Sequence, residues 1–156
     1  MAVNTEKQIY DFLSQRRLAF VGVSRKKKDF SRILFKEFID RKYEVIPVNP
    51  GASDIDGFPC YKKVGEIEPP VQGALLITSL NMTEQLVTEC IEAGIPRIWI
   101  YGLMGSPSAN KSAIEMCRKE GVSVISGHCP LMFFPAAGLV HRFHAALLKL
   151  LGRYPK

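Results

Sequence analysis

The chain has 156 residues, enough for one domain with a full core, and we expect residues 1–156 to form a single domain. Its apolar share of 47% and charged share of 23% are typical of a globular protein, and its apolar runs are too short to span a membrane. A net charge of +6 favours an anionic partner without identifying it.

The N-terminus and the cysteines indicate the compartment. The first residues contain no continuous apolar stretch of the kind found in secretory signals. The cysteines form neither a CxxC pair nor a metal-ligand spacing: Cys60, Cys90, Cys117 and Cys129. We therefore expect a reduced, cytoplasmic protein.

Helix and strand patterns alternate through the first half of the chain. Ile9, Phe12 and Leu13 share one helical face, and the short apolar run that ends at Gly22 and Val23 is typical of a buried parallel strand. The predicted elements are a helix over 4–15, a strand over 18–23, a helix from Asp29, a strand over 43–48 and a turn at 49–51.

The second half continues the alternation. Asn81, three residues before an acid, has the pattern of a helix N-cap, and Gly94 suits the end of that helix. Ser106 and Pro107 have the order that opens a helix, which Gly121 would close. The remaining elements are predicted strands over 73–78, 97–101 and 122–125 and an amphipathic helix over 137–151.

Short apolar strands that alternate with helices specify an α/β fold. We predict a single doubly wound, Rossmann-like sheet of five parallel strands, with an N-terminal helix and a C-terminal amphipathic helix. Trp99, inside the fourth strand, is predicted to belong to the core. Because ligands of such sheets bind at the carboxyl ends of the strands, the loops that follow the strands form the candidate site.

The loop after the first strand has the features of a phosphate site. Gly22 allows a tight turn, and the N-terminus of the next helix offers free N–H groups and a positive dipole end. Ser24 and Ser31 add hydroxyl donors, residues 25–28 are all basic, and Asp29 brings one negative charge. The pattern predicts a site for a diphosphate, with or without another phosphate. A solvated loop is the alternative interpretation.

A nicotinamide dinucleotide fits the sequence less well. Of the GxGxxG fingerprint only the first glycine is present. An NAD site also needs an acid after the second strand, where this chain has Val48, Asn49 and Pro50, and an NADP site needs a basic residue, which first appears at Lys62. An NAD(P)-dependent oxidoreductase remains an alternative.

Three segments resemble the CoA-binding domain family, the small stand-alone relatives of the N-terminal domain of succinyl-CoA synthetase α subunits and acyl-CoA ligases. They follow the first, second and fifth strands: Val-Gly-Val-Ser at 21–24, Val-Asn-Pro at 48–50 and Gly-His-Cys-Pro at 127–130. The related ligases tend to carry a lysine just after the second segment, where this chain has Gly51 and Ala52.

The resemblance implies that coenzyme A, or an acyl-CoA, lies across the strand ends. Its phosphates would contact the first loop, its adenosine the second, and later loops would add contacts. The implied ligand-binding residues are Gly22, Val23, Ser24, Arg25, Lys26, Lys27, Lys28, Ser31, Arg32, Val48, Asn49, Pro50, Thr78, Ser79, Tyr101 and Gly102. Ligases of this kind need a second domain with a phosphorylatable histidine, so we expect no ligase activity from this chain alone.

We predict no catalytic residue and no metal site. Cys129 follows His128, but neighbours in an extended segment point in opposite directions, so a structural cysteine is expected rather than a reactive thiolate. His141 and His144 stand three residues apart on the last predicted helix, and a zinc ion there would need two further ligands.

The predicted function is non-catalytic binding of coenzyme A or an acyl-CoA by a sensor, carrier or subunit. The last helix carries Val140, Phe143, Leu147 and Leu150 on one face, which we expect to pack on its own sheet or on another subunit, in a homo-oligomer or with a partner, rather than on a membrane. A protein-interaction module that has lost the ligand is a second alternative. Nucleic-acid binding is disfavoured because no aromatic stacking platform accompanies the basic loop.

Overall fold

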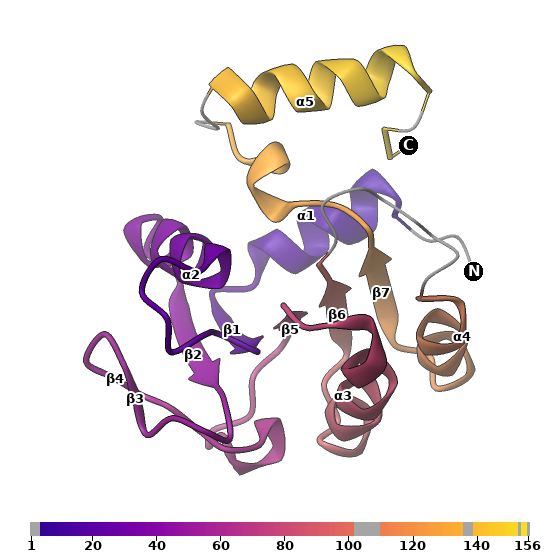
Figure 1. Ribbon diagram of the computed structural model, residues 1–156. Coiled ribbons are helices and arrows are strands. Elements are labelled where there is room, and N and C mark those ends of the chain that lie inside the picture. The colour runs from indigo at the N-terminus through magenta and orange to yellow at the C-terminus, as the bar shows by residue number, and fades with distance from the viewer. Residues whose placement is uncertain (1–3, 102–109, 136–138, 153, 156) are drawn as a thin grey trace.

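The structure is a computed structural model that describes residues 4–101, 110–135, 139–152 and 154–155, without the side chains of 139–141, 144 and 148. Five strands form one parallel sheet in the order β2-β1-β5-β6-β7 (Figure 1). They are β1 (Arg17–Val21), β2 (Glu44–Val48), β5 (Ala74–Leu76), β6 (Arg97–Ile100) and β7 (Ser123–Ser126). Counted along the chain, this is the 2-1-3-4-5 order of flavodoxin-like sheets, and the predicted α/β class with a Rossmann-like sheet of five parallel strands is confirmed.

Helices cover both faces of the sheet. Side chains alternate between the two faces along each strand, so each face carries its own apolar cluster. Leu18 and Phe20 of β1 belong to one apolar cluster, and Ala19 and Val21 belong to the other. Helices α1 (Glu6–Ser14) and α2 (Phe30–Asp40) supply the first cluster, and α3 (Leu80–Glu92) and α4 (Lys111–Lys119) supply the second. Trp99 is fully buried in the first cluster, as predicted.

The helix ends follow the sequence signals with one correction. The N-cap of helix α3 is Ser79, which has an extended backbone, two residues before the predicted N-cap Asn81, so the helix begins at Leu80. Gly94 and Gly121 have φ values of +72° and +69° just after α3 and α4, as predicted for glycines that end helices. The predicted start of a helix at Ser106 lies outside the described residues.

A small hairpin, absent from the sequence prediction, follows β2. Its two-residue strands are β3 (Asp54–Ile55) and β4 (Phe58–Pro59). Asp56 and Gly57 form the turn with φ values of +51° and +83°, the conformation that favours Asp-Gly in tight hairpins. The 3₁₀ turn η1 (Val64–Glu66) then leads toward β5.

The C-terminal helix α5 (Leu139–Leu150) follows the 3₁₀ turn η3 (Pro130–Phe133) and lies outside the sheet and its helical layers (Figure 1). Its apolar face is exposed: Phe143 is 72% exposed, Leu147 44% and Leu150 84%. Of the two expected packings, on the chain's own sheet or on another subunit, these three side chains do not show the first. Among the described α5 side chains, Ala145 packs against the core. Within the described residues, no helix has the length and apolar character that a membrane crossing requires.

Candidate functional site

The candidate site begins where the strand order changes direction, between β1 and β5. Gly22 follows β1 with a φ of +96°, and its N–H donates to the Val48 carbonyl at 2.9 Å. A Cβ on Gly22 would collide with the carbonyl oxygen of Ile77, which follows β5. The chain segments after β1, β2 and β5 therefore meet at Gly22, and the contact requires a glycine.

A chain of hydrogen bonds shapes residues 22–29, which we call the basic loop. The Ser31 hydroxyl accepts from the Ser24 N–H at 2.9 Å and donates to the Asp29 carboxylate at 2.6 Å. The Ser24 hydroxyl accepts from the Lys26 N–H at 3.1 Å. Both serines predicted as phosphate donors thus already form hydrogen bonds that hold the loop.

Asp29 is the N-cap of α2, and its carboxylate accepts from the Ser31 N–H at 2.9 Å. The hydrogen bonds from the Ser31 hydroxyl and N–H hold the pKa of Asp29 below its usual value. The carboxylate is therefore ionised at neutral pH. It supplies the one negative charge within the basic loop.

The cations of the basic loop face solvent. The side chains of Arg25, Lys26, Lys27 and Lys28 are all exposed, and within the described part of the chain none of them forms an ion pair. The backbone N–H groups of Arg25, Lys27 and Lys28 have no hydrogen-bond acceptor in the described part of the chain. The loop thus offers four positive charges and three backbone donors, the groups that bind phosphate oxygens.

Arg32 differs from these cations because it is buried, with 7% of its side chain exposed. Its Nε donates to the Asp56 carboxylate at 3.2 Å, and its Nη2 forms an ion pair with the same carboxylate. Its Nη1 donates to the carbonyls of Ser24 and Arg25 at 3.1 and 3.4 Å. The guanidinium is thus held between the β3–β4 hairpin and the basic loop.

The segment after β2 is tied to the basic loop by Asn49. Its side-chain amide donates to the Val23 carbonyl at 2.8 Å, and its side-chain oxygen accepts from the Gly51 N–H at 2.8 Å. The Arg25 guanidinium carbon lies 3.7 Å from where a Cβ on Gly51 would be. A cation from the first loop therefore stands beside the turn after Pro50, where the related ligases tend to have a lysine.

The remaining predicted residues lie at the ends of β5 and β6. Thr78 is partly buried, and the exposed Ser79 donates through its hydroxyl to the side chain of Asn81 at 2.5 Å. The Tyr101 ring stacks on Phe30, the first residue of α2, with centroids 5.3 Å apart and an interplanar angle of 27°. This stack links the start of α2 to the end of β6. Phe30 was not among the residues predicted for the site. Gly102 lies outside the described residues.

Cys129 is buried, with 8% of its surface exposed. Burial raises the pKa of its thiol, which disfavours the thiolate that nucleophilic chemistry needs. Burial also raises the pKa of the neighbouring Tyr101 hydroxyl, which has no hydrogen-bond partner among the described residues. The side chains of His141 and His144 are not among those that the structure describes. Among the described residues, no cluster of three metal-ligating side chains occurs.

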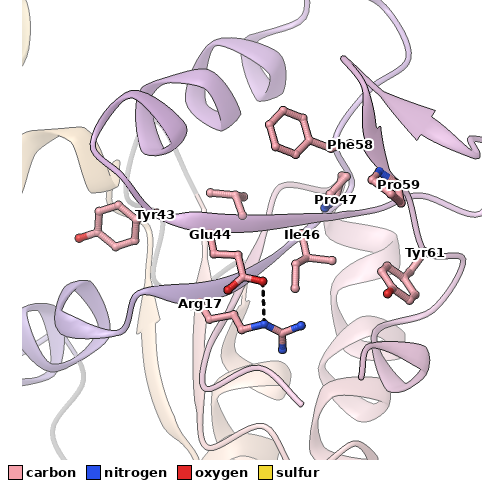
Figure 2. Close-up of a pocket in the computed structure, with 9 residues that line it drawn as sticks. Arg17, Tyr43, Glu44, Ile46, Pro47, Phe58, Pro59 and Tyr61 are labelled. Carbon is pink, nitrogen blue, oxygen red and sulfur yellow. Dashed lines mark hydrogen bonds and ion pairs between the residues drawn. The ribbon is translucent and has the colours of Figure 1, made fainter. Parts of the chain in front are cut away.

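Two hollows lie away from the predicted site. One hollow, of about 230 Å³, lies against the edge strand β2. Figure 2 shows residues that line it, among them Tyr61 and the pair Arg17 and Glu44, which form an ion pair at 3.0 Å. The second, of about 690 Å³, is lined by residues that include Tyr10 and Phe134. None of the predicted ligand-binding residues lines either hollow.

Comparison with known proteins identifies the family. The model of the family described as "CoA binding domain" matches residues 16–135, which contain the whole sheet and the basic loop. The chain belongs to this family. The resemblance inferred from the three loop segments is thereby confirmed.

Two curated relatives show how this CoA binding domain compares in length. The chain is 30% identical over 118 residues to the uncharacterized protein YneT of Bacillus subtilis, covering 73% of this chain and 82% of that protein. It is 28% identical over 127 residues to subunit alpha of acetate–CoA ligase (ADP-forming) II of Pyrococcus furiosus, covering 76% of this chain. It spans only 27% of the length of that ligase subunit.

A solved structure agrees with the fold. A conserved hypothetical protein from Pyrococcus furiosus superposes with a TM-score of 0.66 at 28% identity. The match covers 73% of this chain and 95% of that one.

Proposed function

We propose that the chain binds coenzyme A or an acyl-CoA at the carboxyl ends of its strands and catalyses no reaction by itself. The basic loop carries this proposal: at the switch point of a CoA binding domain, it combines four exposed cations with three backbone donors that lack acceptors within the described residues. Coenzyme A is a polyanion with a diphosphate and a third phosphate on its ribose. Such a loop suits that charge.

In this proposal the diphosphate lies against residues 24–28 and the start of α2. The adenosine lies beside Val48, Asn49 and Pro50, and further contacts come from residues 78–79 and 101–102. The approach of the Arg25 guanidinium to Gly51 supports the arrangement, because it brings a cation between the diphosphate and adenosine regions. That position suits the third phosphate, which distinguishes coenzyme A from its dephospho form.

A nicotinamide dinucleotide is the alternative ligand of such a sheet. No acid stands at the end of β2 to bind a ribose 2′-hydroxyl, and the polar side chain there, Asn49, is engaged by Val23 and Gly51. Coenzyme A therefore accounts better for the residues present.

The proposal that the chain is not catalytic by itself rests on the protonation of the Cys129 thiol. It lies three residues after β7, and the raised pKa of its buried thiol leaves it protonated at neutral pH. A binding role as a sensor, carrier or subunit needs no such nucleophile. The cytoplasm is the proposed compartment, and the four free cysteines support it.

The exposed apolar face of α5 supports a contact with another subunit. Phe143, Leu147 and Leu150 are spaced by four and three residues, the spacing of an apolar helix–helix seam. We propose that this face meets a second copy of the chain or a partner subunit. The same face is the observation that favours the interaction-module alternative.

Thermal unfolding in the presence of five ligands tests the proposed function: CoA, dephospho-CoA, NAD, NADP and ATP at equal concentration. A ligand that binds the folded state stabilises it by about 2.7 kcal/mol at 100 times its Kd. We expect the largest shift with CoA and a smaller one with dephospho-CoA. A larger shift with NAD or NADP would overturn the assignment, and equal shifts with CoA and dephospho-CoA would remove the role of the third phosphate.

A further inference from the structure

The resemblance to the family implies that Arg32 binds phosphate, yet its contacts suggest another role. We propose that Arg32 is a positioning residue: Asp56 of the β3–β4 hairpin holds its guanidinium, which in turn holds the basic loop in the shape that receives the phosphates. The inference rests on the proposed function for its ligand. It assigns to the hairpin a part in that site.

The first step is the occupancy of the guanidinium. An arginine has five N–H donors in a fixed planar fork. In Arg32 the Nε and Nη2 groups donate to the Asp56 carboxylate, and Nη1 is shared between two carbonyls of the basic loop. These bonds use four of the five N–H donors, and with 7% of the side chain exposed the guanidinium has little surface left for a phosphate.

The second step is what the bonds do to the loop. A peptide unit is planar and trans, so its N–H points opposite to its carbonyl. Because the Ser24 carbonyl faces Arg32, the N–H of Arg25 must point away from Arg32. This N–H is one of the donors without an acceptor in the described part of the chain. Arg32 thus turns a backbone donor outward, away from the guanidinium.

The third step is the rigidity of the anchor. Ile55 is 2% exposed, and the Phe58 ring packs edge-on against Phe35 of α2 with centroids 5.5 Å apart. Ile55 is thus buried in the core cluster before the turn, and Phe58 packs on α2 after it, so the hairpin is held on both sides of its turn. Asp56 therefore presents its carboxylate to Arg32 from a fixed position, although half of its own side chain is exposed.

The proposal predicts an effect on affinity opposite in sign to simple electrostatics. Asp56→Asn removes a negative charge near a polyanionic ligand, so charge alone would leave CoA binding unchanged or tighten it. Loss of the clamp instead releases Arg32 and weakens binding, by about tenfold. Asparagine also tolerates the positive φ of the turn, so the hairpin should survive the change.

Asp54→Asn is the matched control. Asp54 lies on the same hairpin, is exposed, and accepts from the Gly57 N–H at 3.0 Å, a bond that asparagine can keep. The substitution removes the same charge without touching Arg32, and we expect unchanged or slightly tighter CoA binding. Arg32→Lys keeps the positive charge but loses the fork, so it should weaken binding as Asp56→Asn does. The double variant should be no weaker than either single variant.

Limited trypsin digestion supplies a readout that needs no ligand. The sites after residues 25–28 are exposed, so the rate of cleavage there reports how firmly the loop is held. We expect Asp56→Asn and Arg32→Lys to be cut faster at these sites than the wild type or Asp54→Asn, at temperatures where all remain folded. Mass spectrometry of the fragments identifies the cuts.

The two readouts separate the clamp from the proposed function. If the wild type binds no CoA, the proposed function fails, while trypsin still decides whether Arg32 holds the loop. If CoA binds and Asp56→Asn binds it as tightly as Asp54→Asn, the clamp is wrong. Weaker binding with unchanged cleavage would assign Arg32 to the phosphate itself and would also overturn the proposal.

Discussion

The lysines of the basic loop allow a direct test of the site, by the variant Lys26→Gln/Lys27→Gln/Lys28→Gln. Glutamine is polar and nearly as long as lysine, so the variant removes three exposed charges with little change in side-chain size. Because these side chains make no ion pair within the described residues, their loss should leave the midpoint of unfolding without ligand almost unchanged.

The expected loss of affinity follows from the exposure of the lysines. An exposed ion pair contributes about 0.2–1 kcal/mol, so three contacts to phosphate should contribute about 0.6–3 kcal/mol. That free energy corresponds to a CoA affinity lower by roughly threefold to 150-fold. Salt should narrow the difference between wild type and variant, because mobile ions screen exposed pairs.

Isothermal titration of CoA at low and at physiological salt measures this effect. The matched control is Lys7→Gln/Lys42→Gln/Lys119→Gln, which removes three exposed lysines from outside the basic loop. An equal loss in both variants would mean that net charge alone attracts the ligand. An unchanged Kd for the loop variant would refute the assignment of these lysines to the phosphates.

Three further predictions concern other parts of the chain. Gly22→Ala should destabilise the fold by more than about 2 kcal/mol in urea unfolding, because a Cβ would meet the Ile77 carbonyl at a positive φ; wild-type stability would contradict the geometry. Alkylation at neutral pH should modify Cys129 no faster than the half-buried Cys60, and rapid selective labelling would reopen an enzymatic role. Leu147→Gln/Leu150→Gln should abolish self-association measured by light scattering if the α5 face joins two copies, whereas a monomeric wild type would leave that face to a different partner.

The sheet was predictable because its strands are short apolar runs whose alternation with helices permits few topologies. The β3–β4 hairpin was not, because two-residue strands carry no periodicity. Its one signal was the pair Asp56 and Gly57, which favours a tight turn. The start of α3 was misplaced because the Asn81 side chain accepts from Ser79 instead of capping the helix.

The candidate site was predictable in location but not in the roles of its side chains. Strand ends in a parallel sheet must converge, so the basic loop and the turn at Asn49 were expected to meet, and a hydrogen bond between Asn49 and Val23 joins them. Whether a cation is exposed or engaged depends on distant partners. Arg25 and Arg32 stand seven residues apart, yet of the two only Arg32 forms an ion pair with a carboxylate among the described residues.

Asp29 has two roles: it caps α2, and it is the negative charge within the basic loop. In the sequence it is an acid beside an expected phosphate. In the structure its carboxylate caps α2 through Ser31, and residues 25–29 keep a balance of four positive charges and one negative charge, or +3. Because the pKa of Asp29 is lowered in the folded chain, its contribution to stability is present at neutral pH and is lost only as the pH falls through that lowered value. The charge that opposes an anionic ligand is therefore also the charge that secures the helix start, and the four cations outweigh it.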